Sequence, residues 1–175
     1  MFGNKFKQAL DEAQETLQRQ KAILDAIDRS NARIEFQPDG KILDANTNFL
    51  ALMGYSLSEV VGQHHRMFCE PSYVSSSEYA NFWQRINRGE FVSGRFKRVN
   101  KAGKAVWLEA TYNPVFDANQ RLHSVIKFAT DVTPAILAAN DQNARLDAIN
   151  RAMAVIDFDT DGNILFANDN FLSVV

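Results

Sequence analysis

Cysteine is almost absent from this chain of 175 residues, which contains only Cys69. A single thiol cannot form a disulfide within its own chain, and this shortage is typical of proteins that fold in a reducing compartment. An excess of one charge is also missing, because 19 basic residues are balanced by 21 acidic ones. Without a basic surplus the chain has no electrostatic means of holding a phosphate backbone, so we predict no nucleic-acid partner.

Long hydrophobic runs are missing as well. No stretch approaches the roughly 18 apolar residues of a membrane-spanning helix, and the N-terminal MFGNKFKQALDEAQ lacks the apolar core of a signal peptide. We therefore expect a cytoplasmic protein with no membrane insertion. The apolar content is nevertheless 46%, with 13 phenylalanines, which is ample for the packed core of a globular domain.

Catalytic motifs are also lacking. The sequence has no Ser/His/Asp arrangement, no glycine-rich phosphate loop and no Cys or His cluster with metal-ligand spacing. Four acidic residues lie where turns and strand ends are expected, and turn chemistry accounts for them: Asp39, Asp44, Asp117 and Asp131. We predict that the chain is not an enzyme and has neither catalytic residues nor a metal site of its own.

An internal repeat defines the domain plan. LDAIDRSNARIEFQPDGKILDANTNFLALM from Leu24 recurs as LDAINRAMAVIDFDTDGNILFANDNFLSVV from Leu146, with 17 of 30 positions identical and an offset of 122 residues. A unit of this length can bury its own core, so we expect tandem domains rather than a solenoid. The predicted plan is an N-terminal helix at 1–23, a complete domain at 24–133, a linker helix at 134–145 and the truncated start of a second domain at 146–175.

The N-terminal segment has the spacing of a coiled-coil seam. Its heptad positions alternate by four and three residues, and a polar Gln20 interrupts them: Phe6, Leu10, Ala13, Leu17, Gln20, Leu24 and Ile27. Two readings fit this pattern, an amphipathic helix packed on its own domain or a helix that pairs with a second copy. We favour the dimerising helix because Lys, Glu, Gln and Arg fill the other positions.

Alternating apolar residues predict five strands in one repeat unit. Two of them flank Pro38-Asp39-Gly40, which is typical of a hairpin turn, and three follow a helical region. The predicted strands are Ala32 to Gln37, Lys41 to Ala45, Phe91 to Val99, Lys104 to Phe116 and Leu122 to Thr130. This order indicates an α+β fold with one five-stranded antiparallel sheet and short helices on one face.

Capping signals predict the helices between the second and third strands. Asn46 caps a short helix, and Ser56 with Glu59 forms a capping box for another. The same spacing at Ser75 and Glu78 opens a longer helix, which contains Trp83.

The chain resembles the PAS family over essentially all of Leu24 to Thr133, and three stretches carry the resemblance. They are DGKILDANTNFLALMGYSLSEVVGQ, FWQRINRGEFVSGRFKRVNKAGKAVWLEATYNPVFD and IKFATDVT. The resemblance implies a sensory domain with strand order two, one, five, four, three, in which the helices and the sheet enclose a pocket. It is most similar to bacterial chemoreceptors with tandem PAS domains, of the biofilm-dispersion and aerotaxis type.

The resemblance also points to pocket residues and cofactors. His64 and His65 flank the expected pocket, and either could ligate haem iron, although a solvent-exposed or core-satisfied histidine is the simpler reading. In PAS photoreceptors a reactive cysteine occupies the position of His65, and Cys69 lies four positions too late, so flavin-cysteinyl photochemistry is not expected.

Two tryptophans are further pocket candidates. Trp83 lies in the long helix, as in flavin-binding aerotaxis domains, while Trp107 alternates with Leu108 on a strand. The asparagine of those flavin domains is replaced here by Arg98 or a neighbour, and Trp83 also fits a helix packed on the sheet. The cofactor, whether haem, FAD or none, is therefore left open.

The end of the first domain predicts a signal output. Asp131 and Thr133 match residues that couple the sheet to the outgoing helix in similar PAS domains, and Pro134 fits the first turn of that helix. A simple helix start explains the same residues. We expect a homodimeric sensory module that relays a small-molecule, redox or oxygen signal, the alternative being a haem- or flavin-bound sensor of a histidine kinase or diguanylate cyclase. The stimulus and the downstream signalling domain are not predicted.

Overall fold

The computed structural model describes residues 2–175, with side chains from residue 7 onward. The chain divides into two compact units that meet between Val132 and Thr133, and we describe each by itself. No helix among the described residues is both long enough and apolar enough to cross a membrane.

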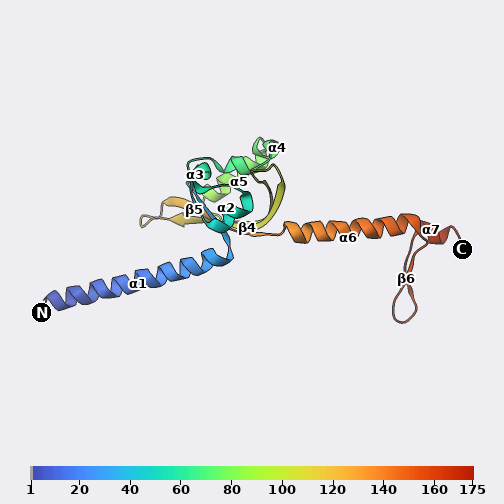
Figure 1. The fold of residues 1–175 in the computed structure, drawn as a ribbon, viewed down its shortest axis with the longest axis horizontal. Coiled ribbons are helices and arrows are strands. Elements are labelled where there is room, and N and C mark those ends of the chain that lie inside the picture. The colour runs from blue at the N-terminus through green and yellow to red at the C-terminus, as the bar shows by residue number, and fades with distance from the viewer. Residues whose placement is uncertain (1) are drawn as a thin grey trace. The chain divides into compact units, whose positions relative to one another are not determined.

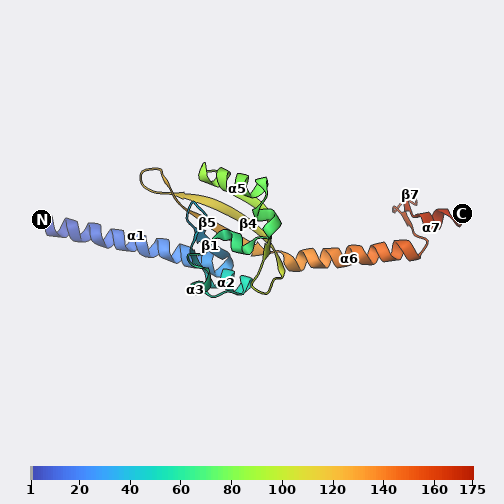
Figure 2. The same ribbon diagram turned by 90° about the horizontal axis from the view of Figure 1, so that it is seen from above.

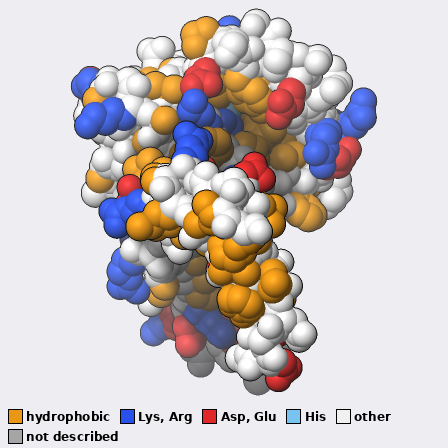
Figure 3. All heavy atoms as spheres, turned by 90° about the vertical axis from the view of Figure 1, so that its right-hand side faces the viewer, with side chains coloured by type: hydrophobic (Ala, Val, Ile, Leu, Met, Phe, Trp, Pro, Cys, Tyr) orange, Lys and Arg blue, Asp and Glu red, His pale blue; other side chains and the backbone are white. Residues whose placement is uncertain are grey.

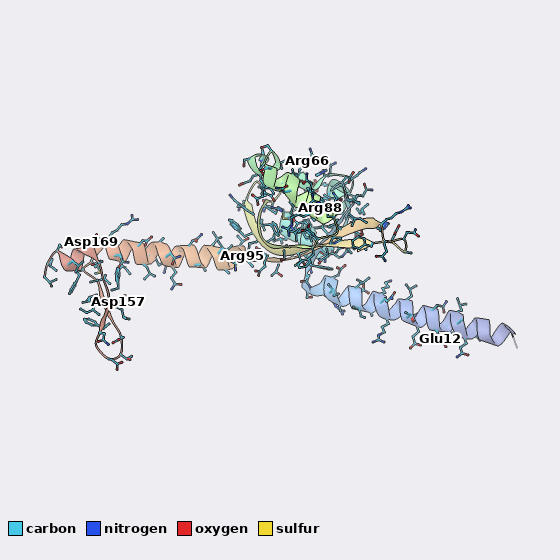
Figure 4. All side chains as sticks on the ribbon, turned by 180° about the vertical axis from the view of Figure 1, so that it is seen from behind. Glu12, Arg66, Arg88, Arg95, Asp157 and Asp169 are labelled. Atoms are coloured by element: carbon cyan, nitrogen blue, oxygen red, sulfur yellow. The ribbon has the colours of Figure 1, made fainter. Side chains whose placement is uncertain are left out.

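The first unit begins with the helix α1, which spans Phe2–Ser30. Residues 7–26 are all exposed, including the large apolar side chains of Leu10, Leu17 and Leu24. Figure 4 shows side chains such as Glu12 standing out from this helix on all sides. The helix ends where Asn31 Nδ2 donates to the Ile27 carbonyl oxygen at 3.2 Å.

A five-stranded antiparallel sheet follows. Its strands are β1 (Ala32–Phe36), β2 (Ile42–Ala45), β3 (Val92–Val99), β4 (Ala105–Phe116) and β5 (Leu122–Asp131). Their order in the sheet is β2-β1-β5-β4-β3, so the expected strand order and α+β fold are confirmed. The central strand β5 pairs with both β1 and β4, which places it between the two halves of the sheet.

Short helices lie beside the sheet between β2 and β3 (Figures 1 and 2). They are α2 (Thr47–Met53), α3 (Leu57–Val60), the 3-10 helix η1 (His65–Phe68), α4 (Pro71–Val74) and α5 (Ser77–Asn87). Asn46 caps α2 as predicted, and the capping box at Ser56 and Glu59 is present.

The predicted cap of the longest of these helices, α5, is wrong by one residue. The Ser76 hydroxyl oxygen, not that of Ser75, accepts a hydrogen bond from the Tyr79 amide at 3.2 Å. The reason is that α4 occupies the preceding turn, and Ser75 Oγ donates to the Pro71 carbonyl oxygen at its end. The sequence pattern missed α4 as a separate helix.

The core lies between the helices and the covered face of the sheet. Alternate residues of β4 point into it, because successive side chains of a strand face opposite sides. Its most buried apolar members, each at most 1% exposed, are Ile34, Phe36, Ile42, Phe49, Met53, Val60, Ile86, Leu108, Tyr112 and Val125.

The second unit contains the other copy of the repeat. It consists of α6 (Thr133–Ala152), β6 (Ile156–Phe158), β7 (Ile164–Ala167) and α7 (Asp169–Leu172). The strands β6 and β7 pair only with each other. Phe158, Ile164 and Leu165 remain more than half exposed, and Figure 3 shows hydrophobic side chains gathered along this hairpin.

One hydrogen-bonding arrangement occurs in both units. The Asn46 side chain accepts from the Arg33 and Phe49 amides and donates to the carbonyl oxygens of Asp28 and Asn31, at 2.8 to 3.1 Å. Asn168 makes the four equivalent bonds at 2.7 to 2.9 Å, each to the residue 122 positions further on. The repeat in sequence is therefore also a repeat in structure.

Candidate sensing site

A cluster of polar side chains lies buried on the covered face of the sheet. His65, Arg98 and Lys127 are each at most 2% exposed. Around them lie Tyr79, Cys69 and Tyr112. These residues come from η1, α5 and three strands, so the cluster joins the helices to the sheet.

The chain places His65 through the turn between β1 and β2. The His65 amide donates to the Gly40 carbonyl oxygen at 2.8 Å, and the neighbouring His64 forms a bridge with Lys41. Gly40 has φ +89°, and a Cβ atom there would lie within 3 Å of the His64 and Trp83 rings. Only glycine fits this close approach, which holds the histidine segment against the turn.

His65 is hydrogen-bonded at both ring nitrogens. Nδ1 shares a hydrogen bond with the Tyr79 hydroxyl and Nε2 shares one with the Tyr112 hydroxyl, each at 3.1 Å. Its ring stacks on Tyr79 and Phe82, with ring centroids 5.8 Å apart in both pairs. Burial lowers the pKa of His65 well below its ordinary value, and the charges of Arg98 and Lys127 lower it further. His65 is therefore neutral at physiological pH.

Arg98 enters the cluster from the edge strand β3. Its Nη2 donates to the Tyr112 hydroxyl oxygen at 3.2 Å and its Nη1 to the Lys97 carbonyl oxygen at 2.8 Å. The guanidinium lies over two rings, 5.0 Å from the centre of Phe96 and 5.6 Å from that of Tyr73. Its Nε is buried without a hydrogen-bond partner. One donor of this arginine is thus left unsatisfied in the interior.

Lys127 enters from the central strand β5. Its ammonium nitrogen lies 5.0 Å from the ring centre of Tyr112 and 5.8 Å from that of Phe49. Burial lowers the pKa of Lys127 well below its ordinary value, and the charge of Arg98 acts in the same direction. Burial also raises the pKa of Tyr112 to about 12 and raises that of the Cys69 thiol.

The cluster has an unbalanced charge. None of the ion pairs found among residues 7–175 includes Arg98 or Lys127. No carboxylate is among the main influences on the pKa of either side chain, which are burial and the neighbouring Arg, Tyr and Cys groups. Buried charges are normally paired, because their desolvation costs several kcal/mol per ion. The site therefore combines a buried arginine, a buried lysine and neutral hydrogen-bonding groups, and neither basic side chain has an ion-pair partner among residues 7–175.

The other predicted pocket residues are only partly brought together. His64 is partly buried, and its Nδ1 accepts from the Arg66 amide at 3.1 Å. Trp83 lies edge-on to the His65 ring at 5.4 Å, and its Nε1 is buried without a partner. Trp107 is not at the site, because Leu108 occupies the covered face and Trp107 the opposite one. The sequence pattern did not say which alternate residues of β4 face the helices, and the structure shows that Leu108 does and Trp107 does not.

The predicted relay residues lie at the end of β5. Asp131 is the last residue of the strand and pairs with Leu108 of β4. The Val132 amide donates to the Trp107 carbonyl oxygen at 2.9 Å. The helix α6 begins at Thr133, one residue before the predicted linker helix at 134–145, and Pro134 lies in its first turn. Strand and helix are thus joined without an intervening loop.

Neither haem nor flavin fits the site in this conformation. Both ring nitrogens of His65 are engaged by tyrosines, so iron ligation would break one of these bonds. The space between sheet and helices is filled by rings such as Phe36 and Phe82, whose centroids lie 6.4 and 4.8 Å from that of Tyr112. Among the described residues, no group of three or more His, Cys, Asp or Glu side chains could hold a metal ion.

Among the members of this cluster, sequence reasoning named only His65 as a pocket candidate and missed Tyr79, Cys69, Arg98, Tyr112 and Lys127. Lys127 shares its strand phase with Val125 and Ala129, which could have placed it on the covered face. The opposite phase contains Ile126 and Phe128, which are equally apolar, so the alternation alone could not decide between the two.

Comparison with known proteins agrees with the fold. Residues 42–129, half of the chain, match the PAS fold family. The chain is 51% identical over 150 residues to the biofilm dispersion protein of Pseudomonas aeruginosa, a match that covers 86% of this chain and 36% of that protein. It is 34% identical over 74 residues to the aerotaxis receptor of Escherichia coli, covering 42% and 14%. The chain thus spans about a third or less of the length of these relatives.

A solved structure shows the same architecture. The crystal structure of a PAS domain from Colwellia psychrerythraea has a TM-score of 0.57 and 24% identity, and the match covers 67% of this chain and 98% of that one. The predicted resemblance to PAS domains and to chemoreceptors is confirmed by these matches. By the family match over half its length and by its five-stranded sheet, this chain belongs to the PAS family.

Proposed function

We propose that this chain is the sensory module of a cytoplasmic, chemoreceptor-like signal transducer, and that it acts by conformational change rather than by catalysis. The observation that carries the proposal is the position of Lys127. This buried cation lies on β5, and the same strand leads through Val132 into α6. A change of charge or contact around Lys127 therefore acts on the strand that leaves the domain.

The relay works through the end of β5. Asp131, Thr133 and Pro134 form the junction, and the bond from the Val132 amide to Trp107 ties it to β4. A stimulus shifts such a system only if it favours one of two arrangements of the sheet. The short, proline-containing junction supports transmission because it leaves few backbone torsions to absorb a movement of the strand.

Hydrogen exchange tests this relay. Lys127→Met alters the buried cluster without touching the junction, and we expect it to change amide protection in β5 and in the first turns of α6. Lys104→Met, in the exposed turn before β4, serves as the matched control. A change confined to the neighbours of Lys127, with α6 identical in both proteins, would contradict the relay.

Dimerisation through α1 is the second part of the proposal. Leu10, Leu17 and Leu24 of the predicted seam are 50%, 66% and 57% exposed. Apolar side chains at heptad spacing are typical of helices that pair with another copy. Light scattering after size-exclusion chromatography should give the mass of a dimer at tens of micromolar, and a strict monomer would exclude this part.

We also propose that no haem or flavin is bound, because the interior is filled and His65 is fully engaged. The purified protein is expected to show neither a Soret band nor flavin absorbance, even after incubation with either cofactor. Stoichiometric uptake of either would favour the alternative, a redox or gas sensor.

A further inference from the structure

Arg98 and Lys127 are both buried beside Tyr112, and neither belongs to an ion pair among residues 7–175. The Tyr112 hydroxyl accepts from Arg98, while the Tyr112 ring lies 5.0 Å from the Lys127 side-chain nitrogen. A guanidinium stays charged even when it is buried, so Arg98 bears the cost of lost hydration. An anion beside Arg98 would offset part of that cost.

Arg98 presents an unused donor for such an anion. Its side chain is 2% exposed, yet Nε has no hydrogen-bond partner. The guanidinium lies over the Tyr73 and Phe96 rings, and its Nη1 and Nη2 are already engaged by Lys97 and Tyr112. Nε is thus the donor that remains for a carboxylate oxygen.

A surface groove leads to this arginine. It has a volume of about 190 Å³, and Arg98 forms part of its wall together with Tyr73 and Phe96. Glu70 and Lys97 stand at the same groove and form an ion pair at 2.8 Å, with both side chains about two-fifths exposed. Because this pair is exposed to water, it is weak and can open at little cost.

The charges of the groove limit the anion. Two carboxylates, Glu70 and Glu78, face three cationic side chains there, Arg95, Lys97 and Arg98. An anion with several charges would be repelled by the glutamates, and the aromatic walls favour an apolar body. These features together select a singly charged organic acid of small size.

From this geometry we propose that the domain binds a small organic monocarboxylate, which enters the groove past the Glu70–Lys97 pair and accepts a hydrogen bond from Arg98 Nε. This inference rests on the proposed sensory function and names its ligand class. Arg98 also donates to Tyr112 of β4, so a ligand there acts on the strand that pairs with β5.

Titration calorimetry on the 175-residue protein tests the proposal. Butyrate and benzoate are the probes, and butyramide and benzamide are their uncharged counterparts. We expect one acid per chain and at least tenfold weaker binding of the amides. Arg98→Met should weaken the acids at least tenfold, whereas Arg88→Met, an exposed arginine outside the groove (Figure 4), should leave them unchanged.

A second variant separates the loss of the guanidinium from the loss of folding. Arg98→Lys retains the charge but loses the fork, and should weaken binding while the protein remains folded. Absence of binding for both acids, or equal binding of acids and amides, would overturn the ligand class. Dimerisation and the response of α6 to Lys127→Met are measured without any ligand, so failure of this inference is distinguishable from failure of the proposed function.

Discussion

Lys127 is a residue whose burial is costly to this domain. It is enclosed by aromatic rings, and none of the ion pairs of residues 7–175 includes it. Natural proteins keep such groups at functional sites although an apolar side chain would be more stable there.

We therefore predict that Lys127→Met raises the free energy of unfolding by about 1–3 kcal/mol at pH 7. The folded-state pKa of Lys127 is lowered, so the unfolded chain binds more protons and the native protein gains stability as the pH rises toward 10.5. Urea unfolding at pH 7 and pH 9 measures this effect: the difference in the free energy of unfolding between Lys127→Met and the native protein should be smaller at pH 9. An advantage that stays constant between these pH values would argue against a lysine with a lowered pKa.

His65 should make the domain sensitive to acid. Its folded-state pKa lies well below 6.5, so on acidification His65 takes up a proton in the unfolded chain but not in the folded one. The contribution of neutral His65 to the free energy of unfolding is therefore complete above pH 6.5 and is lost as the pH falls below that value. Between pH 7.5 and pH 5 the native chain should lose about 2 kcal/mol more than His65→Phe. Urea unfolding at both pH values measures this difference, and parallel losses would disprove it. His64→Asn is the control and should retain most of the effect.

At the level of elements, strands were easier to predict than the burial of their charged residues. Alternation located all five strands to within one residue at most ends, because the covered face needs apolar side chains at every second position. The same rule could not place Arg98, since β3 carries polar residues in both phases. Burial there depends on Tyr73 and Tyr112, which lie 25 and 14 residues away along the chain. Contacts of that kind are not visible in a local pattern.

Asn46 joins three elements, the end of α1, β1 and the start of α2. Asn46→Ala removes two acceptor and two donor bonds and should lower the free energy of unfolding by about 2–4 kcal/mol. Asn46→Asp keeps the acceptors but sets a negative charge against two carbonyl oxygens, so it should not restore stability. Thermal unfolding measures both variants, and Asn48→Ala, in a more exposed position, is the milder comparison. A fully stable Asn46→Asp would show that the two donor bonds contribute little.

For the whole molecule, the main exposed apolar surfaces lie on elements outside the five-stranded sheet and its helices. In the part of the chain that the structure describes, the apolar seam of α1 and the face of the β6–β7 hairpin are both exposed. Surfaces of this kind commonly bind a second protein surface, and a further copy of the chain is our proposed partner for α1.

Substitutions in the seam of α1 should both strengthen and weaken the dimer. Gln20→Leu should tighten the dimer at least tenfold, because a polar residue at a seam position costs stability in a coiled coil. Leu17→Glu should dissociate it, whereas Gln18→Glu, outside the seam, should not. Sedimentation equilibrium over a range of concentrations gives the dissociation constants. Equal effects of Leu17→Glu and Gln18→Glu would place the interface elsewhere.

The repeated asparagine arrangement has a consequence for α6. This helix leaves the first sheet at Thr133, and its last turn is bound by Asn168 through the carbonyl oxygens of Asn150 and Met153. In the proposed relay, this helix is the output of one repeat and the input of the next, so the two repeats would act in series. An α-helix turns by about 100° per residue. Its length therefore sets an angular phase, which two inserted residues would shift by roughly half a turn and seven would nearly preserve.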